Sequence, residues 1–420
     1  MFFLYQILVI ILLIFSPLII FFRILKKKEH RKRYKEKFCF PSKKCIKGNL
    51  IWFHGSSVGE LLSIIPLVQE LEKNKSINQI LITTSTLSSA QIFKKFNFKK
   101  TVHQFFPIDS ILFSYKFLNY WKPTIAIFVE SEIWPSIFKA LSKKNIPLRL
   151  LNARITKKTF KKWQSVKKFS NSVFKNISIA YPQNEETFNY LKKLNVKKIK
   201  KIGNLKFVSN KKNEFNKLDK TLLKNLNPKK IWCASSTHPG EEIICADVHI
   251  NLKKKYKNLL TIIIPRHIHR VNKIVNEIKS LDLNIVLHSS RPKKLNNTDI
   301  YLVDTYGETQ KFYHSSDIVF MGKSISGKGG QNPLEPTNLG STVLYGPNVD
   351  NFKDTYKLLN KLKVAYKVNG VKSLTQSIDK LITKPNNKKN YLKIAKMGKK
   401  ILNETKDEIN SLFNNEIKKT

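Results

Sequence analysis

The first half of the chain carries glutamates at places where an acid–base residue could act. Glu60 ends the motif HGSSVGE (54–60), and Glu130 and Glu132 belong to a second motif, ESEIWP. A carboxylate within hydrogen-bond reach of an attacking hydroxyl can serve as a general base. Glu130 and Glu132 could act as acid and base, could bind several hydroxyls of a sugar, or could be solvated loop residues beside a core Trp134.

The spacing of Ser57 and Glu60 also fits a helix capping box. In that motif the serine accepts from the glutamate amide and the glutamate binds back to the serine amide, so spacing alone leaves both roles open. The glycines Gly55 and Gly59 would let a bulky acceptor approach the backbone closely. Arg154, in the motif NAR, is a rare arginine among many lysines, and its planar fork has a geometry that lysine does not reproduce.

Three segments of the second half suit a phosphate group. The motif SSTHPGEE (235–242) places hydroxyls before an expected helix with Pro239 in its first turn, which would leave N–H groups for an anion. Arg266 offers a guanidinium to a phosphate. The Gly-rich segment 322–336 runs into an expected helix at Pro333, an arrangement that cradles phosphate, and Glu335 could take a ribose diol.

Motifs that are absent from the second half narrow the class of ligand. No GxxxxGK[ST] and no early GxGxxG occurs, which favours a nucleotide-sugar donor over a hydride cofactor or a phosphotransferase. No Asp-x-Asp occurs either, which argues against a metal-bridged diphosphate donor.

Short apolar runs alternate with amphipathic stretches from about residue 48, as in parallel sheets covered by helices. The predicted strands are 50–53, 80–84, 125–130, 148–152, 177–181, 231–234, 259–264, 284–287, 300–304, 318–321, 342–345 and 364–368. Ligands of such sheets bind beyond the carboxyl ends of the strands, which is where the motifs stand. The stretch 390–413 looks helical and could pack back across the first domain.

The pattern divides the chain into six parts. We predict a membrane anchor at 1–22, a basic juxtamembrane segment at 23–47, a first α/β domain at 48–207, a linker at 208–230, a second α/β domain at 231–384 and a C-terminal helical segment at 385–420. The linker is predicted because it is rich in Lys and Asn and poor in apolar runs.

The N-terminus is apolar from residue 1 to 22 and basic from Arg23 to Lys37. About 20 apolar residues can cross a hydrocarbon core of roughly 30 Å. The charges follow the apolar stretch and no small-residue cleavage site is present, unlike a signal peptide. A spanning helix would leave the rest of the chain in the cytoplasm, and the basic cluster would attract anionic lipids. The alternative is an interfacial helix that does not span.

The net charge is +48, from 77 basic and 29 acidic residues. Only eight of the basic residues are Arg, whereas proteins that read nucleic acid rely on Arg, so a compositional Lys bias explains most of the excess. With 41% hydrophobic residues the chain is not a disordered polycation. The four cysteines have no metal-binding spacing and fit a reducing compartment without disulfides.

Nine motifs in order over about 300 residues resemble the 3-deoxy-D-manno-octulosonic acid (Kdo) transferase family of lipid A biosynthesis. They are HGSSVGE, ESEIWP, NAR, GNLK (203–206), SSTHPGEE, PRHIHR (265–270), DTYGET (304–309), GKGGQNPLEP (327–336) and GPNVDNF (346–352). The resemblance implies a GT-B-type α/β fold, with two Rossmann-like domains facing a cleft and an N-terminal transmembrane helix. It implies inverting transfer of Kdo from CMP-Kdo to a lipid A precursor, lipid IVA, without metal or cofactor, at the cytoplasmic face of the bacterial inner membrane.

Carried over by position, Glu60 matches the catalytic base of the family. Acceptor-side candidates are Ser57, Gly59, Glu130, Glu132 and Arg154. Donor-binding candidates are Ser236, Thr237, Arg266, Gly307, Glu308, Ser324, Gly329, Gly330, Asn332, Glu335 and Asn351. The expected partners are CMP-Kdo, the lipid A precursor and the anionic inner leaflet, and not nucleic acid. Two rivals are a GT-B enzyme that uses a UDP-sugar and a membrane-tethered nucleic-acid binder.

Overall fold

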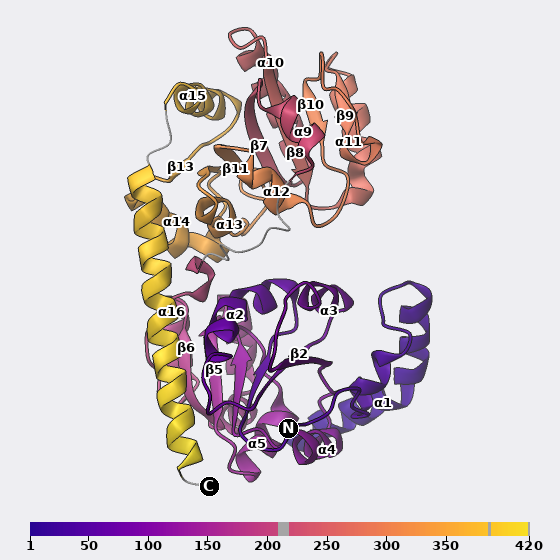
Figure 1. Cartoon of the computed structure of the whole chain (residues 1–420), viewed down its shortest axis with the longest axis vertical. Coiled ribbons are helices and arrows are strands. Elements are labelled where there is room, and N and C mark those ends of the chain that lie inside the picture. Colours follow the sequence, from indigo (N-terminus) through magenta and orange to yellow (C-terminus); the bar gives the residue numbers. More distant parts are fainter. Residues whose placement is uncertain (209–217, 385–387, 419–420) are drawn as a thin grey trace. The chain divides into compact units, whose positions relative to one another are not determined.

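The computed structural model describes residues 1–208, 218–384 and 388–418. The chain forms two compact units. The first unit is Met1–Val208 together with the chain from Gly398, and the second unit is Ser209–Met397. Each unit is built on one parallel sheet, and helices connect the strands (Figure 1).

The sheet of the first unit has the strand order β3-β2-β1-β4-β5-β6. Its strands are β1 (Leu50–His54), β2 (Gln79–Thr84), β3 (Thr101–Phe105), β4 (Ile125–Val129), β5 (Leu148–Ala153) and β6 (Ile177–Pro182). The five predicted strands of this half are present. The edge strand β3 was missed, because its sequence TVHQF contains polar His103 and Gln104 and gives no apolar run.

Five helices of the first unit begin at residues that sequence rules favour. Ser57, Thr86, Ser110, Thr156 and Asn184 each accept a backbone N–H at a helix N-cap. The helices are α1 (Phe2–Leu25), α2 (Val58–Leu71), α3 (Leu87–Phe93), α4 (Ile111–Trp121), α5 (Pro135–Lys143), α6 (Lys157–Ser165), α7 (Lys167–Phe174) and α8 (Glu185–Lys193), with 3-10 turns η1 (Arg33–Phe38) and η2 (Leu205–Phe207).

Aromatic packing fills the core between β1, β4 and their helices. The ring of Trp52 lies 4.7 Å from that of Phe117 and 5.1 Å from that of Phe128, centroid to centroid. All three side chains are buried, and Nε1 of Trp52 donates to Oγ1 of Thr83. A core of this kind makes the strand ends a rigid support for loops.

The sheet of the second unit has the order β13-β12-β11-β7-β8-β10-β9. Its strands are β7 (Lys230–Thr237), β8 (Leu259–Pro265), β9 (Ile285–Leu287), β10 (Ile300–Leu302), β11 (Ile318–Met321), β12 (Thr342–Tyr345) and β13 (Ala365–Lys367). The helices are α9 (Lys220–Leu226), α10 (Glu241–Lys253), α11 (Val271–Lys279), α12 (Thr309–His314), α13 (Leu334–Asn338), α14 (Lys353–Lys361) and α15 (Val371–Ile382), with 3-10 turns η4 (Ile268–Arg270), η5 (His288–Ser290) and η6 (Asp350–Phe352).

The segment predicted as a linker, 208–230, is partly described. Residues 209–217 lie outside the described residues, α9 occupies Lys220–Leu226, and β7 begins at Lys230. Asp219 caps α9 by accepting from the amide of Leu222.

The C-terminal helix α16 (Lys388–Ile417) begins in the second unit and ends in the first. Its Glu408 accepts from the hydroxyl of Tyr181 at 3.0 Å and pairs with Nζ of Lys200 at 2.5 Å. Asn410 accepts from Asn74. The last helix therefore packs on the first unit.

The N-terminal helix α1 is continuous through Pro17. It is long and apolar enough to cross a membrane, by length and composition alone. Its exposed surface is almost wholly apolar, whereas only Val9, Ser16 and Ile20 are buried.

Candidate active site

The carboxylates predicted for chemistry gather where the strand order of the first sheet reverses. β1 and β4 are parallel neighbours in the centre of that sheet, and ligands of doubly wound sheets bind at this switch point. Glu60 lies in the first turn of α2, which follows β1, and the loop after β4 carries Glu130 and Glu132.

Glu60 forms the predicted capping box at the start of α2. Its amide donates to Oγ of Ser57 at 3.3 Å, and its Oε2 accepts from the amide of Ser57 at 2.9 Å. The capping bond uses Oε2, so Oε1 remains for another partner. The two roles that spacing left open are therefore compatible.

The environment of Glu60 raises its pKa to about 7. Burial is the largest cause, the negative charge of Glu132 is next, and Glu130 adds to it, whereas the hydrogen bonds from Ser57 act in the opposite direction. A carboxyl with this pKa is ionised in part near neutral pH and is basic enough to take a proton from a hydroxyl in a transition state.

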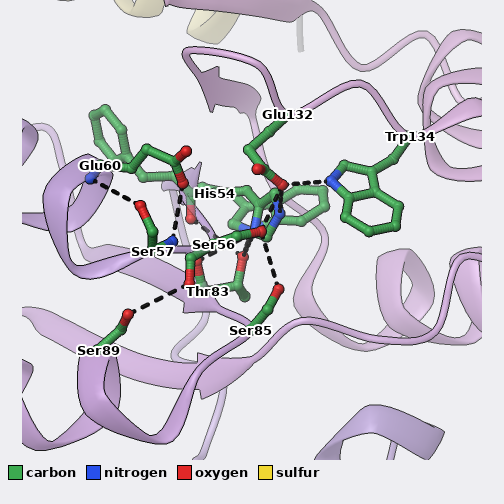
Figure 2. A network of polar contacts seen from close by, with 11 residues as sticks. His54, Ser56, Ser57, Glu60, Thr83, Ser85, Ser89, Glu132 and Trp134 are labelled. Carbon is green, nitrogen blue, oxygen red and sulfur yellow. Dashed lines mark hydrogen bonds and ion pairs between the residues drawn. The ribbon is translucent and has the colours of Figure 1, made fainter. Parts of the chain in front are cut away.

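Glu132 is held by three donors on one oxygen (Figure 2). Oε2 of Glu132 lies 3.0 Å from Nε2 of His54, 2.5 Å from Oγ of Ser56 and 2.7 Å from Nε1 of Trp134. Burial acts to raise the pKa of Glu132, but the hydrogen bonds and charge of its neighbours outweigh burial and lower the pKa. Glu132 therefore keeps its negative charge near Glu60.

His54 is a site residue to which the sequence assigned no role. The ring is buried, and its Nδ1 lies 3.0 Å from Oγ1 of Thr83. Ser56 is fixed in the same network, because its hydroxyl contacts that of Ser85 and its carbonyl accepts from Oγ of Ser89 (Figure 2). The signal that the sequence offered for this role was a histidine at the end of a predicted strand and at the start of the motif HGSSVGE.

Glu130 lies on the other side of the same loop in a left-handed conformation, with φ at 57°. Its Oε1 is 2.6 Å from Nζ of Lys206, a second residue without an assigned role. The amide of Arg154 donates to the carbonyl of Glu130, and Oγ of Ser131 donates to the carbonyl of Arg154. The motifs ESEIWP, NAR and GNLK thus form one cluster.

Ser57 and Gly59 lie on the exposed side of this site. A Cβ built on Gly59 would meet nothing closer than Oγ of Ser57 at 4.0 Å, whereas one on Gly55 would lie 3.1 Å from Cβ of Glu60. Packing therefore explains the glycine at 55 but not the glycine at 59, where a side chain would have room.

In the second unit, Glu241 occupies the place predicted for an anion. α10 begins at Glu241 behind Gly240, so the expectation of Pro239 in its first turn is wrong. The buried carboxylate of Glu241 accepts from the amides of Lys323, Ser324, Ile325 and His238 at 2.7, 2.9, 3.0 and 2.9 Å. A buried carboxylate requires hydrogen-bond donors. These amides therefore stabilise Glu241 within the fold.

The later part of the Gly-rich loop requires its glycines. Gly329 and Gly330 have φ of 93° and 67°, which L side chains rarely adopt. The amide of Asn351 donates to the carbonyl of Gly329, and Oδ1 of Asn332 accepts from the amide of Leu334. This brings Gly329, Gly330, Asn332 and Asn351 together after β11 and β12.

The side chain of Ser324 is buried within the same loop. Its hydroxyl donates to the carbonyl of Met321 and accepts from the amide of Gly346. Ser324 therefore holds the loop through its side chain.

Arg266 is exposed at the end of β8. Its amide donates to the carbonyl of Thr237, which places it beside the end of β7, where Ser236 precedes Thr237. The hydroxyl of Thr237 donates to Glu242, whose carboxylate is also bound through both oxygens by Arg270. Arg270 is thus structural, whereas the guanidinium of Arg266 forms no ion pair with the described residues.

The remaining donor candidates are Gly307, Glu308 and Glu335. Gly307 and Glu308 precede α12, and Glu308 pairs with Lys311 at 2.7 Å. Glu308 also lines a hollow of about 710 Å³ with His288 and Tyr301. Glu335 is exposed on the short helix α13.

Among the described residues, no group of three or more His, Cys, Asp or Glu side chains could hold a metal ion. The four cysteines are free thiols, and three of them are buried.

Comparison with known proteins places the chain in a family. Residues 32–209 match the family model described as 3-deoxy-D-manno-octulosonic-acid transferase (kdotransferase). The 3-deoxy-D-manno-octulosonic acid transferase of Rickettsia bellii is 33% identical over 421 residues, which cover 98% of this chain and 99% of that relative. The chain belongs to the Kdo transferase family. The Kdo transferase of Haemophilus influenzae is 30% identical, with 96% of each chain covered.

Solved structures support the architecture of this Kdo transferase family member. A glycosyltransferase from Rickettsia africae matches with a TM-score of 0.59 at 14% identity, covering 89% of this chain and 100% of that one. A UDP-GlcNAc 2-epimerase from Neisseria meningitidis matches with a TM-score of 0.56 at 16% identity, covering 84% and 98%. The predicted GT-B-type α/β fold and the apolar N-terminal helix are confirmed.

Proposed function

We propose that this glycosyltransferase moves Kdo from CMP-Kdo to a lipid A precursor, lipid IVA, by an inverting single displacement. Membership of the Kdo transferase family identifies Kdo as the transferred sugar. The observation that carries the mechanism is the carboxyl of Glu60, which lies in the first turn of α2 at the switch point of the first sheet and has its pKa raised to about 7 by burial and by the charges of Glu132 and Glu130.

In the proposed step, a sugar hydroxyl of the acceptor attacks the anomeric carbon of Kdo. Its proton goes to the carboxylate of Glu60 as the new C–O bond forms. The bond between the anomeric carbon and the phosphate oxygen breaks, and CMP leaves with the electron pair. Attack opposite the leaving group inverts the anomeric centre. General-base assistance of this kind contributes about 10² to 10⁴ in rate.

Negative charge on the leaving phosphate requires preorganised positive partners. Arg266 is exposed at the end of β8 and forms no ion pair with the described residues, so its guanidinium is available. The loop Gly329–Asn332 lies after β11, and its backbone N–H groups other than that of Gly330, which donates to the carbonyl of Lys323, are the further donors of the proposal. The amides of Lys323–Ile325 are not counted here, since Glu241 takes them.

The proposed reaction uses neither metal nor cofactor. CMP carries one phosphate, for which an arginine and backbone donors can suffice, whereas a diphosphate leaving group carries more charge. We expect transfer to persist in EDTA.

We further propose that the acceptor is reached at the cytoplasmic face of a bacterial inner membrane. The support is the apolar helix α1 followed by a cluster of basic residues. An anionic leaflet attracts such a cluster.

The test is incubation of the purified full-length chain with CMP-Kdo and lipid IVA in mixed micelles with EDTA present. Mass spectrometry should find lipid IVA enlarged by one or more Kdo residues, and NMR should find inverted anomeric configuration. Parallel reactions with UDP-sugars should give no product. Transfer from a UDP-sugar but not from CMP-Kdo, or a strict metal requirement, would contradict the proposal.

A further inference from the structure

The two ends of the N-terminal helical segment are attached to the same place on the first unit. The hydroxyl of Tyr5, one turn into α1, donates to Oδ2 of Asp109 at 2.6 Å. The carbonyl of Lys37, twelve residues after the end of α1, accepts from the amide of Ile108 at 3.0 Å. The chain therefore starts α1 beside Asp109 and, after the helix, returns to Ile108, the residue that precedes Asp109 in the sequence.

The attachment at the start of α1 is polar and partly buried. Nε2 of Gln6 donates to Oγ of Ser136 at 2.8 Å, and Oε1 of Gln6 accepts from the amide of Ile111 at 3.2 Å. Asp109 is 5% exposed and also accepts from the amide of Ser136. Tyr5 and Gln6 thus bind at the starts of α4 and α5, and they are polar residues in an otherwise apolar stretch of α1.

The return segment is fixed by buried carboxylates. Glu29 is 4% exposed and pairs with Arg23 at 3.2 Å and with Lys37 at 2.5 Å. Glu36 is 1% exposed, pairs with Arg33 and accepts from the amide of Phe105 at 2.7 Å. Removing one partner of a buried pair is costly, so this end is tied firmly to β3.

The exposed surface of the segment has an apolar part on α1 and a basic part on the chain that follows it. On α1 the exposed large apolar side chains are Phe3, Leu4, Ile7, Leu8, Ile10, Ile11, Leu12, Ile14, Phe15, Leu18, Ile19, Phe21, Phe22 and Leu25. On the return segment the exposed basic side chains are Lys26, Lys27, Lys28, Arg31, Lys32 and Lys35. An apolar helix beside a row of cations complements acyl chains next to anionic headgroups.

A membrane-crossing helix has its ends on opposite sides of a hydrocarbon core of roughly 30 Å. Here Tyr5 contacts the same folded unit as the segment after the helix, and the returning chain is too basic to lie in hydrocarbon. Crossing would require the bonds of Tyr5 and Gln6 to the body to break, which would leave Asp109 without its phenol partner.

We propose that α1 lies in the plane of one leaflet of an anionic phospholipid membrane and does not cross it. Its exposed apolar face lies among the acyl chains, and the basic residues of 26–35 lie at the headgroups. Tyr5 and Gln6 fix the helix to the first unit at its N-terminal end, and Glu29 and Glu36 fix the returning chain. This attachment stands whether or not Glu60 is the catalytic base.

Spin-label depth on the full-length chain in phosphatidylglycerol-containing vesicles tests the orientation. The labelled positions are the exposed Leu4, Leu12, Leu18 and Leu25, each changed singly to Cys. The background is Cys45→Ser, because Cys39, Cys233 and Cys245 are buried. An in-plane helix gives four similar, shallow depths, with buried Val9→Cys as the shielded control. A maximum depth at Leu12 with surface values at Leu4 and Leu25 would overturn the proposal.

Protease protection gives a second measurement that needs no substitution within the helix. An epitope is added before Met1, and the enzyme is bound to sealed vesicles with its catalytic units on the outer side. Protease is then added to the outside of the vesicles. In-plane attachment leaves the epitope on the side of the catalytic units, so it is cleaved. Protection of the epitope until detergent is added would show crossing and contradict the proposal.

The anionic partner is tested by charge removal. Each cation near an anionic surface strengthens partition about fivefold, so K26A/K27A/K28A should lower partition to phosphatidylglycerol vesicles about 10²-fold and leave partition to neutral vesicles unchanged. The matched control K254A/K257A/K279A removes three exposed lysines of the second unit and should have little effect. Equal losses in both triple variants would refute a specific role for the basic segment.

Discussion

Nε2 of His54 lies 3.0 Å from Oε2 of Glu132, at the end of the strand that leads to Glu60. With that nitrogen protonated, the imidazole donates to Glu132 and stabilises its negative charge. That charge in turn raises the pKa of Glu60. The histidine therefore acts on the candidate base through Glu132.

Replacing Glu60 by Gln should abolish Kdo transfer and leave the fold intact. Gln keeps an acceptor for the amide of Ser57 but takes no proton, so we expect a loss of about 10² or more in kcat. Folding raises the pKa of Glu60 from 4.5 to about 7, so the ionised carboxylate costs stability as pH rises through this window. The Tm at pH 8 should therefore be equal or higher in the variant. Turnover near the unsubstituted rate would refute the assignment.

The pH dependence should report on Glu132. Because Glu60 must be ionised to act, kcat/KM should rise with pH up to about 7 and then level off. Glu132→Gln removes a negative neighbour, which lowers the pKa of Glu60 and moves this rise to lower pH. Glu130→Gln should move it less, since Glu132 is the larger influence. A rise that stays in place, or moves up, in E132Q would contradict the coupling.

Gly59→Ala should separate acceptor access from folding. A Cβ at this position meets open space, and Ala is favoured over Gly in a helix by roughly 1 kcal/mol, so Tm should not fall. Transfer should fall at least tenfold if the acceptor passes here. The matched Gly55→Ala places its Cβ 3.1 Å from Glu60 and should lower Tm. Full activity in G59A would remove Gly59 from the site.

Two arginines of the motif PRHIHR should behave differently. Arg266→Ala should raise KM for CMP-Kdo and lower kcat with Tm unchanged, because its exposed side chain forms no ion pair with the described residues. Arg270→Ala should lower stability by about 3 kcal/mol, because it leaves the buried Glu242 without its cation. Kinetics unaltered by R266A would exclude the phosphate role.

Glu241→Gln should destabilise the Gly-rich loop, although Glu241 is not itself a proposed donor-binding residue. An amide side chain presents N–H to the amides of Lys323–Ser326, so at least one buried donor loses its partner at a cost of about 1–3 kcal/mol. Thermal unfolding should detect this as a lower Tm, with weaker CMP binding by calorimetry. An unchanged Tm would show that the carboxylate does not hold this loop.

Local sequence was sufficient for much of the architecture. Runs of β-branched residues predicted twelve of the strands, and the Ser57–Glu60 spacing predicted a capping box that the structure contains. These features depend on residues close together in the chain. The strand β3 escaped because an edge strand can carry polar residues such as His103.

The sequence by itself determined the alternation of strands and helices, the placement of the motifs at strand ends and the family. Only the tertiary structure decided which side chains meet. It paired His54 with Glu132, Lys206 with Glu130 and Glu241 with the loop amides. These partners stand 78, 76 and more than 80 residues apart. No local pattern encodes such contacts, because they arise when parallel strands bring distant loops to one edge of a sheet.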